Sequence, residues 1–226
     1  MTSTTFEKTE TTRSETDSTG GSQTVFEVRK DTVFQGYFRV DKYHLRHSLF
    51  AGGVSPVFTR EIFERGHAAA VIPFCPETGR VLLIEQFRAG AYSAGMPCWQ
   101  IEIVAGVIET SEQADELCRR EAIEEAGCTL GRLESIGKYL MTPGGSSETV
   151  SIFCGEVSSH QEAESYGVEE ENEDIRAFWL PVEDAFNWVK SNKISNAVTV
   201  IALQWLQLNL DSLTTTWSDA THVSAE

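Results

Sequence analysis

The stretch from Gly106 to Cys128 constrains the fold more than any other part of the sequence, because it joins a loop, a helix and many carboxylates. The loop becomes helical near Glu112, and Gly127 ends the helix, since glycine readily adopts the left-handed conformation of a helix C-cap. The acidic residues of the stretch are Glu109, Glu112, Asp115, Glu116, Glu121, Glu124 and Glu125. The stretch therefore predicts a helix with a dense negative charge.

Helical spacing predicts where these charges lie. Glu121 and Glu125 are four residues apart and share one helix face, with Glu124 beside them. The same side carries three apolar residues that should face the interior, Ala114, Leu117 and Cys118. Carboxylates at the edge of a buried face repel one another and are poorly hydrated, and a hard divalent cation such as Mg²⁺ relieves both costs. A solvated acidic face is the alternative explanation.

The spacing of this stretch resembles the Nudix box. Its fixed positions are filled, in order, by Gly106, Glu112, Arg120, Glu121, Glu124, Glu125 and Gly127. Two apolar positions hold Ala122 and Cys128, which are smaller than the branched residues usual there. The chain is thus similar to the Nudix hydrolases, which cleave a nucleoside diphosphate linked to another moiety.

Composition narrows the partners and the compartment. The net charge of −16 argues against nucleic acid or an anionic membrane as a partner. The chain has five scattered cysteines, which are typical of buried reduced thiols and not of a disulfide framework or a zinc site. The sequence shows neither an apolar run of membrane-spanning length nor a signal at its start, so we expect a cytoplasmic protein.

The pattern along the chain predicts four segments. Residues 1–24 and 214–226 are expected to be disordered tails, because they are rich in small and polar residues. Residues 25–65 form an N-terminal antiparallel β subdomain, with strands at Val33–Val40, Tyr43–Phe50 and Val57–Arg65. Without a helix these strands make a poor core, so they must pack on the next domain or on a second copy of the chain.

Residues 66–213 are expected to form an α/β domain, a mixed sheet sandwiched between helices. Strands are predicted at 68–74, 81–87, 99–105, 133–140, 149–157 and 175–180, and helices at 182–191 and 195–210. The whole is therefore expected to be a Nudix fold in which the N-terminal sheet is used for dimerisation.

A proline beyond the box makes the resemblance narrower. Pro143 lies fifteen residues past Cys128, where the ADP-ribose pyrophosphatases of the superfamily carry one. The chain is especially similar to the bacterial homodimeric members, over about 33–208, in segments such as 60–67, 83–86, 171–176 and 201–208. This resemblance implies hydrolysis of ADP-ribose to AMP and ribose 5-phosphate.

The resemblance also implies roles for individual residues. Glu121, Glu125, Glu173 and the backbone carbonyl of Ala105 would hold two or three Mg²⁺ ions, with Mn²⁺ as an alternative. Glu171 would be the general base, on a loop that swings in after the substrate binds, although its acidic segment alone reads as a solvated loop. The remaining box residues of interest are Arg120, which would orient the carboxylates, and Glu112 and Glu124, which would be further ligands or their supports.

On the substrate side, the resemblance assigns three groups of residues. Arg88 would contact a diphosphate oxygen and Val107 would line the pocket, unless Arg88 is a surface residue and Val107 a core residue. The terminal ribose would be held by Thr142, Pro143, Gly144 and Glu148. The adenine would be held across a homodimer interface by Tyr37, Phe38, Arg60, Glu61 and Arg65. Core packing is the alternative for Tyr37 and Phe38.

Two other functions remain open at this point. One is a pyrophosphatase for another nucleoside-diphosphate sugar, such as GDP-mannose, since purine choice depends on a few contacts. The other is a Nudix module that binds ADP-ribose as a sensor without cleaving it. Such modules usually lose box carboxylates, whereas this chain keeps all of them.

Overall fold

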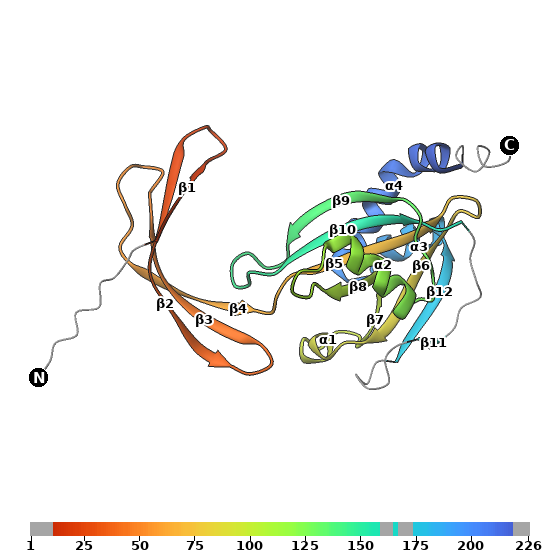
Figure 1. Ribbon diagram of the computed structural model, residues 1–226, viewed down its shortest axis with the longest axis horizontal. Helices are drawn as coiled ribbons and strands as arrows, with labels where there is room; N and C mark the ends of the chain where they lie inside the picture. The colour runs from red at the N-terminus through yellow and green to blue at the C-terminus, as the bar shows by residue number, and fades with distance from the viewer. Residues whose placement is uncertain (1–10, 159–164, 167–173, 219–226) are drawn as a thin grey trace, which may run out of the picture. The chain divides into compact units, whose positions relative to one another are not determined.

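The computed structural model describes residues 11–158, 165–166 and 174–218, which form two compact units (Figure 1). Unit 1 is Met1–Gly66 with Leu140–Glu148, and unit 2 is His67–Tyr139 with Thr149–Glu226. The sequence predicted a division between residues 65 and 66, and unit 1 includes Gly66. The prediction did not foresee that Leu140–Glu148 belongs with the N-terminal sheet.

Unit 1 is a four-stranded sheet with the order β1-β2-β3-β4. Its strands are β1 (Thr11–Thr16), β2 (Ser22–Gln35), β3 (Arg39–His47) and β4 (Phe58–Glu64), and neighbouring strands are antiparallel. The predicted strand Val33–Val40 is wrong, because the chain turns at Gly36, whose N–H donates to the carbonyl of Phe38 at 2.8 Å. The predicted strand Tyr43–Phe50 is too long at its C-terminal end, since β3 ends at His47.

The prediction of a disordered tail over residues 1–24 is wrong for residues 11–24, and residues 1–10 lie outside the described part. The first two strands meet at a turn in which the Asp17 carboxylate accepts hydrogen bonds from the backbone of Thr19 and Gly21, both at 2.9 Å. Hydrogen bonds from the Thr19 hydroxyl and from Gln23 also hold the pKa of Asp17 well below its usual range. The composition of the segment does not indicate this turn, because the turn depends on two residues, Asp17 and Gly20.

Unit 2 contains an eight-stranded mixed sheet. Its strands are β5 (Ala68–Cys75), β6 (Arg80–Phe87), β7 (Trp99–Glu102), β8 (Val104–Val107), β9 (Leu133–Leu140), β10 (Thr149–Glu156), β11 (Ser165–Tyr166) and β12 (Ile175–Pro181). The main order is β11-β12-β6-β5-β10-β9, while β7 pairs with β6 and β8 pairs with β5. The single strand predicted at 99–105 is therefore two strands that separate at Ile103 and pair with different neighbours.

Helices cover both faces of this sheet (Figure 1). They are α1 (Ala89–Ser93), α2 (Ala114–Glu124), α3 (Val182–Lys190) and α4 (Ala197–Ser218). Val71 of β5 belongs to the core that contains Leu117 of α2, whereas Phe74 of β5 lies 6.2 Å from Trp217 of α4 between ring centroids. Residues an odd number of positions apart in a strand point to opposite faces, so the sheet lies between α2 and α4. This confirms the predicted α/β fold class.

The predicted C-terminal tail at 214–226 is wrong at its start, because α4 continues to Ser218. Trp217 is only 4% exposed, and Arg132 donates to its carbonyl at 2.7 Å and lies over its ring. Threonines 214–216 have low intrinsic helix propensity, but the burial of Trp217 outweighs it.

Candidate active site on the α2 helix

Helix α2 is fixed at both ends by its own sequence. Gln113 and Glu116 form a reciprocal capping box at the start. At the end, Gly127 has a φ of 59° and its N–H donates to the carbonyl of Ile123 at 3.0 Å. Leu117, Cys118 and Ala122 are buried against β5 and β8. The carboxylates on the adjoining side are thereby held at the edge of the core, as the helix spacing predicted.

The buried edge brings two carboxylates to strand β8. Glu125 is only 5% exposed, and its Oε2 accepts a hydrogen bond from the N–H of Ala105 at 3.1 Å. The Glu121 carboxylate lies against Gly106, where an added Cβ would lie 2.6 Å from the Glu121 Cδ. Only glycine leaves this space free. The structure thus brings together Ala105, Glu121 and Glu125, three of the four predicted metal ligands.

Arg120 forms ion pairs with three carboxylates of the site. Its guanidinium lies 3.1 Å from Glu112, 3.0 Å from Glu121 and 2.8 Å from Glu124. The hydrogen bond from Arg120 lowers the pKa of Glu112, and these carboxylates raise the pKa of Arg120 in turn. Arg120 therefore stays charged and holds three carboxylates in place, consistent with the orienting role predicted for it.

Oxygen atoms dominate this site, which is the donor set that hard divalent cations prefer. Within residues 11–158, 165–166 and 174–218, no group of three or more His, Cys, Asp or Glu side chains is arranged to hold a metal ion. The predicted ligands among the described residues comprise two carboxylates, Glu121 and Glu125, and the backbone carbonyl of Ala105, so fewer than three of these side chains belong to the set. The predicted third carboxylate, Glu173, and the predicted base, Glu171, lie outside the described residues.

Beside this site the structure shows a polar network that the sequence reasoning missed. Glu102, at the end of β7, is 6% exposed, accepts a hydrogen bond from the Nε of Arg88 at 2.9 Å, and forms an ion pair with the Nη2 of Arg88 at 2.8 Å. Asn196 donates to the other oxygen of Glu102 at 2.8 Å. The signal in the sequence was a carboxylate between two apolar residues, Ile101 and Ile103. Arg88 is thus not an ordinary surface arginine.

The residues predicted to bind the adenine and the terminal ribose all belong to unit 1. Tyr37 is 96% exposed, which excludes core packing for its ring. Phe38 lies 4.8 Å from Tyr37 between ring centroids, Arg65 lies over Phe38, and Arg65 pairs with Glu148 at 3.4 Å. The structure therefore joins a residue predicted for the ribose side, Glu148, to residues predicted for the adenine side.

The segment Leu140–Glu148 is attached to β4 by its backbone. The Phe63 N–H donates to the Gly145 carbonyl at 2.8 Å, and the Ser146 hydroxyl donates to the Phe63 carbonyl at 3.0 Å. Within the segment, the amide of Gly145 donates to the carbonyl of Thr142 at 3.0 Å, which makes a turn through Pro143 and Gly144. The remaining predicted residues of unit 1 are exposed, Arg60 over the Phe58 ring and Glu61 at 3.6 Å from Lys42.

Val107 at the end of β8 is 47% exposed, so core packing does not account for it.

The cysteines are free, and burial raises the pKa of the Cys118 and Cys128 thiols to about 12. These two thiols are therefore protonated and inert near neutral pH.

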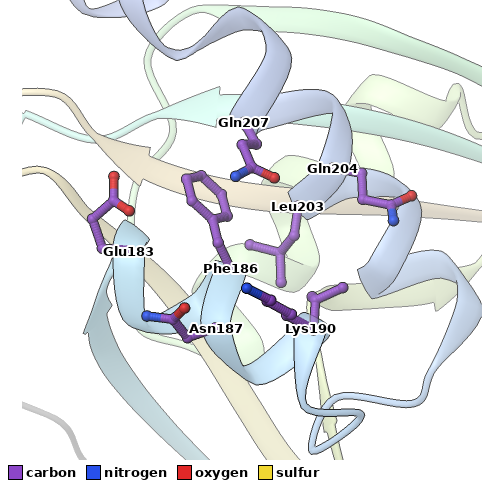
Figure 2. Close-up of a pocket in the computed structure, with 8 residues that line it drawn as sticks. Glu183, Phe186, Asn187, Lys190, Leu203, Gln204 and Gln207 are labelled. Atoms are coloured by element: carbon purple, nitrogen blue, oxygen red, sulfur yellow. The ribbon is translucent and has the colours of Figure 1, made fainter.

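A separate hollow of about 400 Å³ lies between α3 and α4 (Figure 2). Its lining residues are Glu183, Phe186, Asn187, Val189, Lys190, Leu203, Gln204 and Gln207. None of the predicted site residues is among them.

Comparison with known proteins agrees with this geometry. A model of the NUDIX domain matches residues 64–201. The chain belongs to the Nudix family. It is 45% identical over 200 residues to the ADP-ribose pyrophosphatase of Escherichia coli K12, a match that covers 88% of this chain and 96% of that protein. The ADP-ribose pyrophosphatase of Haemophilus influenzae is 39% identical over 83% of this chain and 88% of its own length.

Two matches at lower identity are a GDP-mannose pyrophosphatase and a solved structure. The GDP-mannose pyrophosphatase of Enterobacter sp. 638 is 36% identical over 66% of this chain and 78% of its own length. A solved structure described as an ADP compounds hydrolase superposes with a TM-score of 0.62 at 20% identity, covering 82% of this chain and 94% of that one, which shows the shared fold. In the described part of this chain, no helix is both long and apolar enough to cross a membrane.

Proposed function

We propose that this Nudix hydrolase cleaves ADP-ribose to AMP and ribose 5-phosphate. The observation that carries the proposal is the set of carboxylates that α2 holds at Gly106, in a chain that aligns with ADP-ribose pyrophosphatases over most of its length. The Enterobacter GDP-mannose pyrophosphatase aligns over a smaller share of the chain and at lower identity, so ADP-ribose is favoured over GDP-mannose. The complete box favours an enzyme over a sensor that only binds the nucleotide.

Divalent cations, Mg²⁺ or Mn²⁺, would be held by Glu121, Glu125, Glu173 and the Ala105 carbonyl. When bound, such ions supply charge that stabilises the developing negative charge on the diphosphate and acidify the attacking water. Around them, Arg120 keeps the box carboxylates in place, Glu124 is at the outer edge of the cluster, and Arg88 contacts a diphosphate oxygen. Glu171 accepts the proton of the attacking water.

For the two ends of the substrate, the exposed Tyr37 and the neighbouring Phe38 suit an adenine ring, and Glu148 suits the hydroxyls of a terminal ribose. We propose that the chain is a homodimer in which unit 1 of one protomer supplies the adenine contacts to its partner. Exposed apolar residues in unit 1, among them Phe34, Phe50 and Val57, support a contact between copies.

The test is a product assay across substrates. ADP-ribose, GDP-mannose and other nucleotide sugars are incubated with Mg²⁺ and a phosphatase, and the released phosphate and the nucleotide product are measured. We expect AMP from ADP-ribose at the highest kcat/KM. Preference for GDP-mannose would support the second pyrophosphatase activity, and binding without turnover of any substrate would support a sensor.

The general base is tested by Glu171→Gln. A base acts on the transition state and not on ground-state binding, so kcat should fall by about 10²–10⁴-fold while KM stays nearly unchanged. Glu170→Gln is the matched control, because it removes the same charge from the neighbouring position and should do little. Equal damage by both variants would contradict the assignment of Glu171.

A further inference from the structure

Buried polar side chains of unit 2 gather around Arg88. Gln86, Glu102 and Thr199 are each less than a tenth exposed and belong to one set of hydrogen bonds. Thr199 donates to Asn196 at 3.2 Å and accepts from the N–H of Ile103 at 3.1 Å. Burial of polar side chains stabilises a protein less than burial of apolar side chains does. Fold stability therefore gives little reason for this buried polar network.

The contacts fix the Glu102 carboxylate on both sides. Its Oε2 accepts a hydrogen bond from the Nε of Arg88 at 2.9 Å and lies 2.8 Å from the Nη2 of Arg88 in an ion pair. Its Oε1 accepts a hydrogen bond from Asn196 at 2.8 Å. Because both oxygens are engaged, the carboxylate has one orientation, and two nitrogens of the guanidinium are held to it. The Arg88 side chain is nonetheless 43% exposed, so part of its guanidinium faces outward.

Glu102 also ties Arg88 to the metal-binding edge through the backbone. It lies three residues before Ala105, and the intervening Ile103 is bonded to Thr199 at the start of α4. Asn196 caps the same helix by accepting from the Thr199 N–H at 3.0 Å. Arg88 is therefore anchored to the strand segment that continues directly into the predicted metal ligand.

We propose that Glu102 is a positioning residue that fixes the guanidinium of Arg88 for the diphosphate of the substrate. The inference rests on the proposed function, in which Arg88 contacts a diphosphate oxygen. An arginine free in solution samples many rotamers, whereas one held by a buried carboxylate is already oriented when charge develops on the phosphate. Asn196 serves this arrangement by donating to the other oxygen of Glu102.

The test is a double-mutant cycle with Arg88→Met and Glu102→Gln, measured on ADP-ribose with Mg²⁺. Glu102→Gln should lower kcat by about tenfold and change KM by less than about threefold, because the lost orientation matters most in the transition state. In the Arg88→Met background, adding Glu102→Gln should change kcat/KM by less than about twofold, since Glu102 then has no guanidinium to orient. The same further loss in both backgrounds would overturn the proposal.

Thr199→Val is the matched control, because it breaks the same network at a buried site without touching Arg88. It should lower the unfolding temperature and leave kcat and KM within about twofold of wild type. A loss of kcat as large as that of Glu102→Gln, with the fold intact, would show a general structural effect and overturn the proposal.

The cycle also separates this inference from the proposed function. If Arg88→Met impairs turnover but Glu102→Gln does not, the positioning role fails and the proposed activity stands. If Arg88→Met has wild-type activity on ADP-ribose, the positioning role fails together with the diphosphate contact. If no variant and no wild-type protein hydrolyses ADP-ribose, the proposed function itself fails.

Discussion

The two units differ in the ratio of cations to carboxylates in their main ion-pair clusters. In unit 1 the fully buried Asp41 meets two cations, Lys30 at 2.9 Å and Arg39 at 3.0 Å. In unit 2 the single Arg120 is shared by three carboxylates. The first cluster has two cations around one carboxylate, whereas the second has three carboxylates around one cation. An excess of carboxylates over cations is the arrangement expected where a divalent cation binds.

The largest expected effect is a loss of turnover, and it tests the excess of carboxylates at the α2 site. Glu125→Gln keeps the size of the side chain and its acceptor oxygen but removes one negative charge from the predicted metal site. We expect turnover at saturating Mg²⁺ to fall by at least about a hundredfold, because metal electrostatics carry the chemistry. In the absence of metal, the unfolding temperature should not fall, since repulsion among the carboxylates decreases.

Asp115→Asn is the control for this variant, because Asp115 lies exposed on the same helix and loses the same charge. It should keep activity within about twofold. Activity of Glu125→Gln within threefold of wild type would show that Glu125 is not a metal ligand.

The next effect concerns the space that Gly106 leaves for Glu121. Gly106→Ala adds a methyl group where the Glu121 carboxylate lies, so this ligand must move. We expect kcat to fall by about tenfold or more, since displacement of a catalytic group by about 1 Å is costly. The measurement is kcat as a function of Mg²⁺ concentration, with Gly144→Ala as a comparison on the substrate side, where a Cβ meets open space. Unchanged Mg²⁺ dependence would contradict the predicted role of Glu121.

A smaller effect tests whether unit 1 serves the partner's site. Inactive Glu171→Gln chains are mixed with inactive Arg60→Ala chains and allowed to exchange subunits. Half of the dimers are then mixed and each has one intact site of two, so about a quarter of wild-type activity should return. Exchange is verified by mass spectrometry of the dimers. Absence of recovery after complete exchange would exclude sharing of the site between protomers.

The smallest effect on turnover is expected from the ion pair in unit 1. Asp41→Asn leaves Lys30 and Arg39 partly buried without their counter-charge, so the unfolding temperature should fall by about 5 °C while kcat stays within about twofold. Thermal unfolding followed by circular dichroism measures the change. A loss of kcat without a loss of stability would place Asp41 in the catalytic machinery and break the contrast between the units.

The pH dependence of Asp41→Asn follows from its ionisation. Burial alone would raise the pKa of Asp41, but hydrogen bonds from Lys30 and Thr32 and the charges of Lys30 and Arg39 hold it below its usual range. A depressed folded-state pKa stabilises the protein above the unfolded-state value and loses that contribution as the pH falls through the folded-state value. The difference in stability between wild type and Asp41→Asn should therefore shrink below about pH 4.

The elements that the sequence predicted well are those whose pattern is local. Helix α2, its glycine end and its buried side follow from residues three and four apart, and the hairpin of β5 and β6 follows from two apolar runs around a turn. The errors in unit 1 come from turns set by single residues, Asp17 and Gly36, inside stretches whose composition indicates something else. The late end of α4 was missed because the contact of Trp217 with Phe74 is not visible along the chain.

The sequence by itself determined the family, the α/β fold class and the acidic helix, because box spacing and helical periodicity are properties of neighbouring residues. Only the tertiary structure decided that Glu102 holds Arg88, that Gly106 makes room for Glu121, and that Glu148 joins Arg65 in unit 1. Each of these contacts joins residues fourteen or more positions apart in sequence. Such contacts depend on strand pairing and on which side chains the core excludes, and no local pattern encodes either.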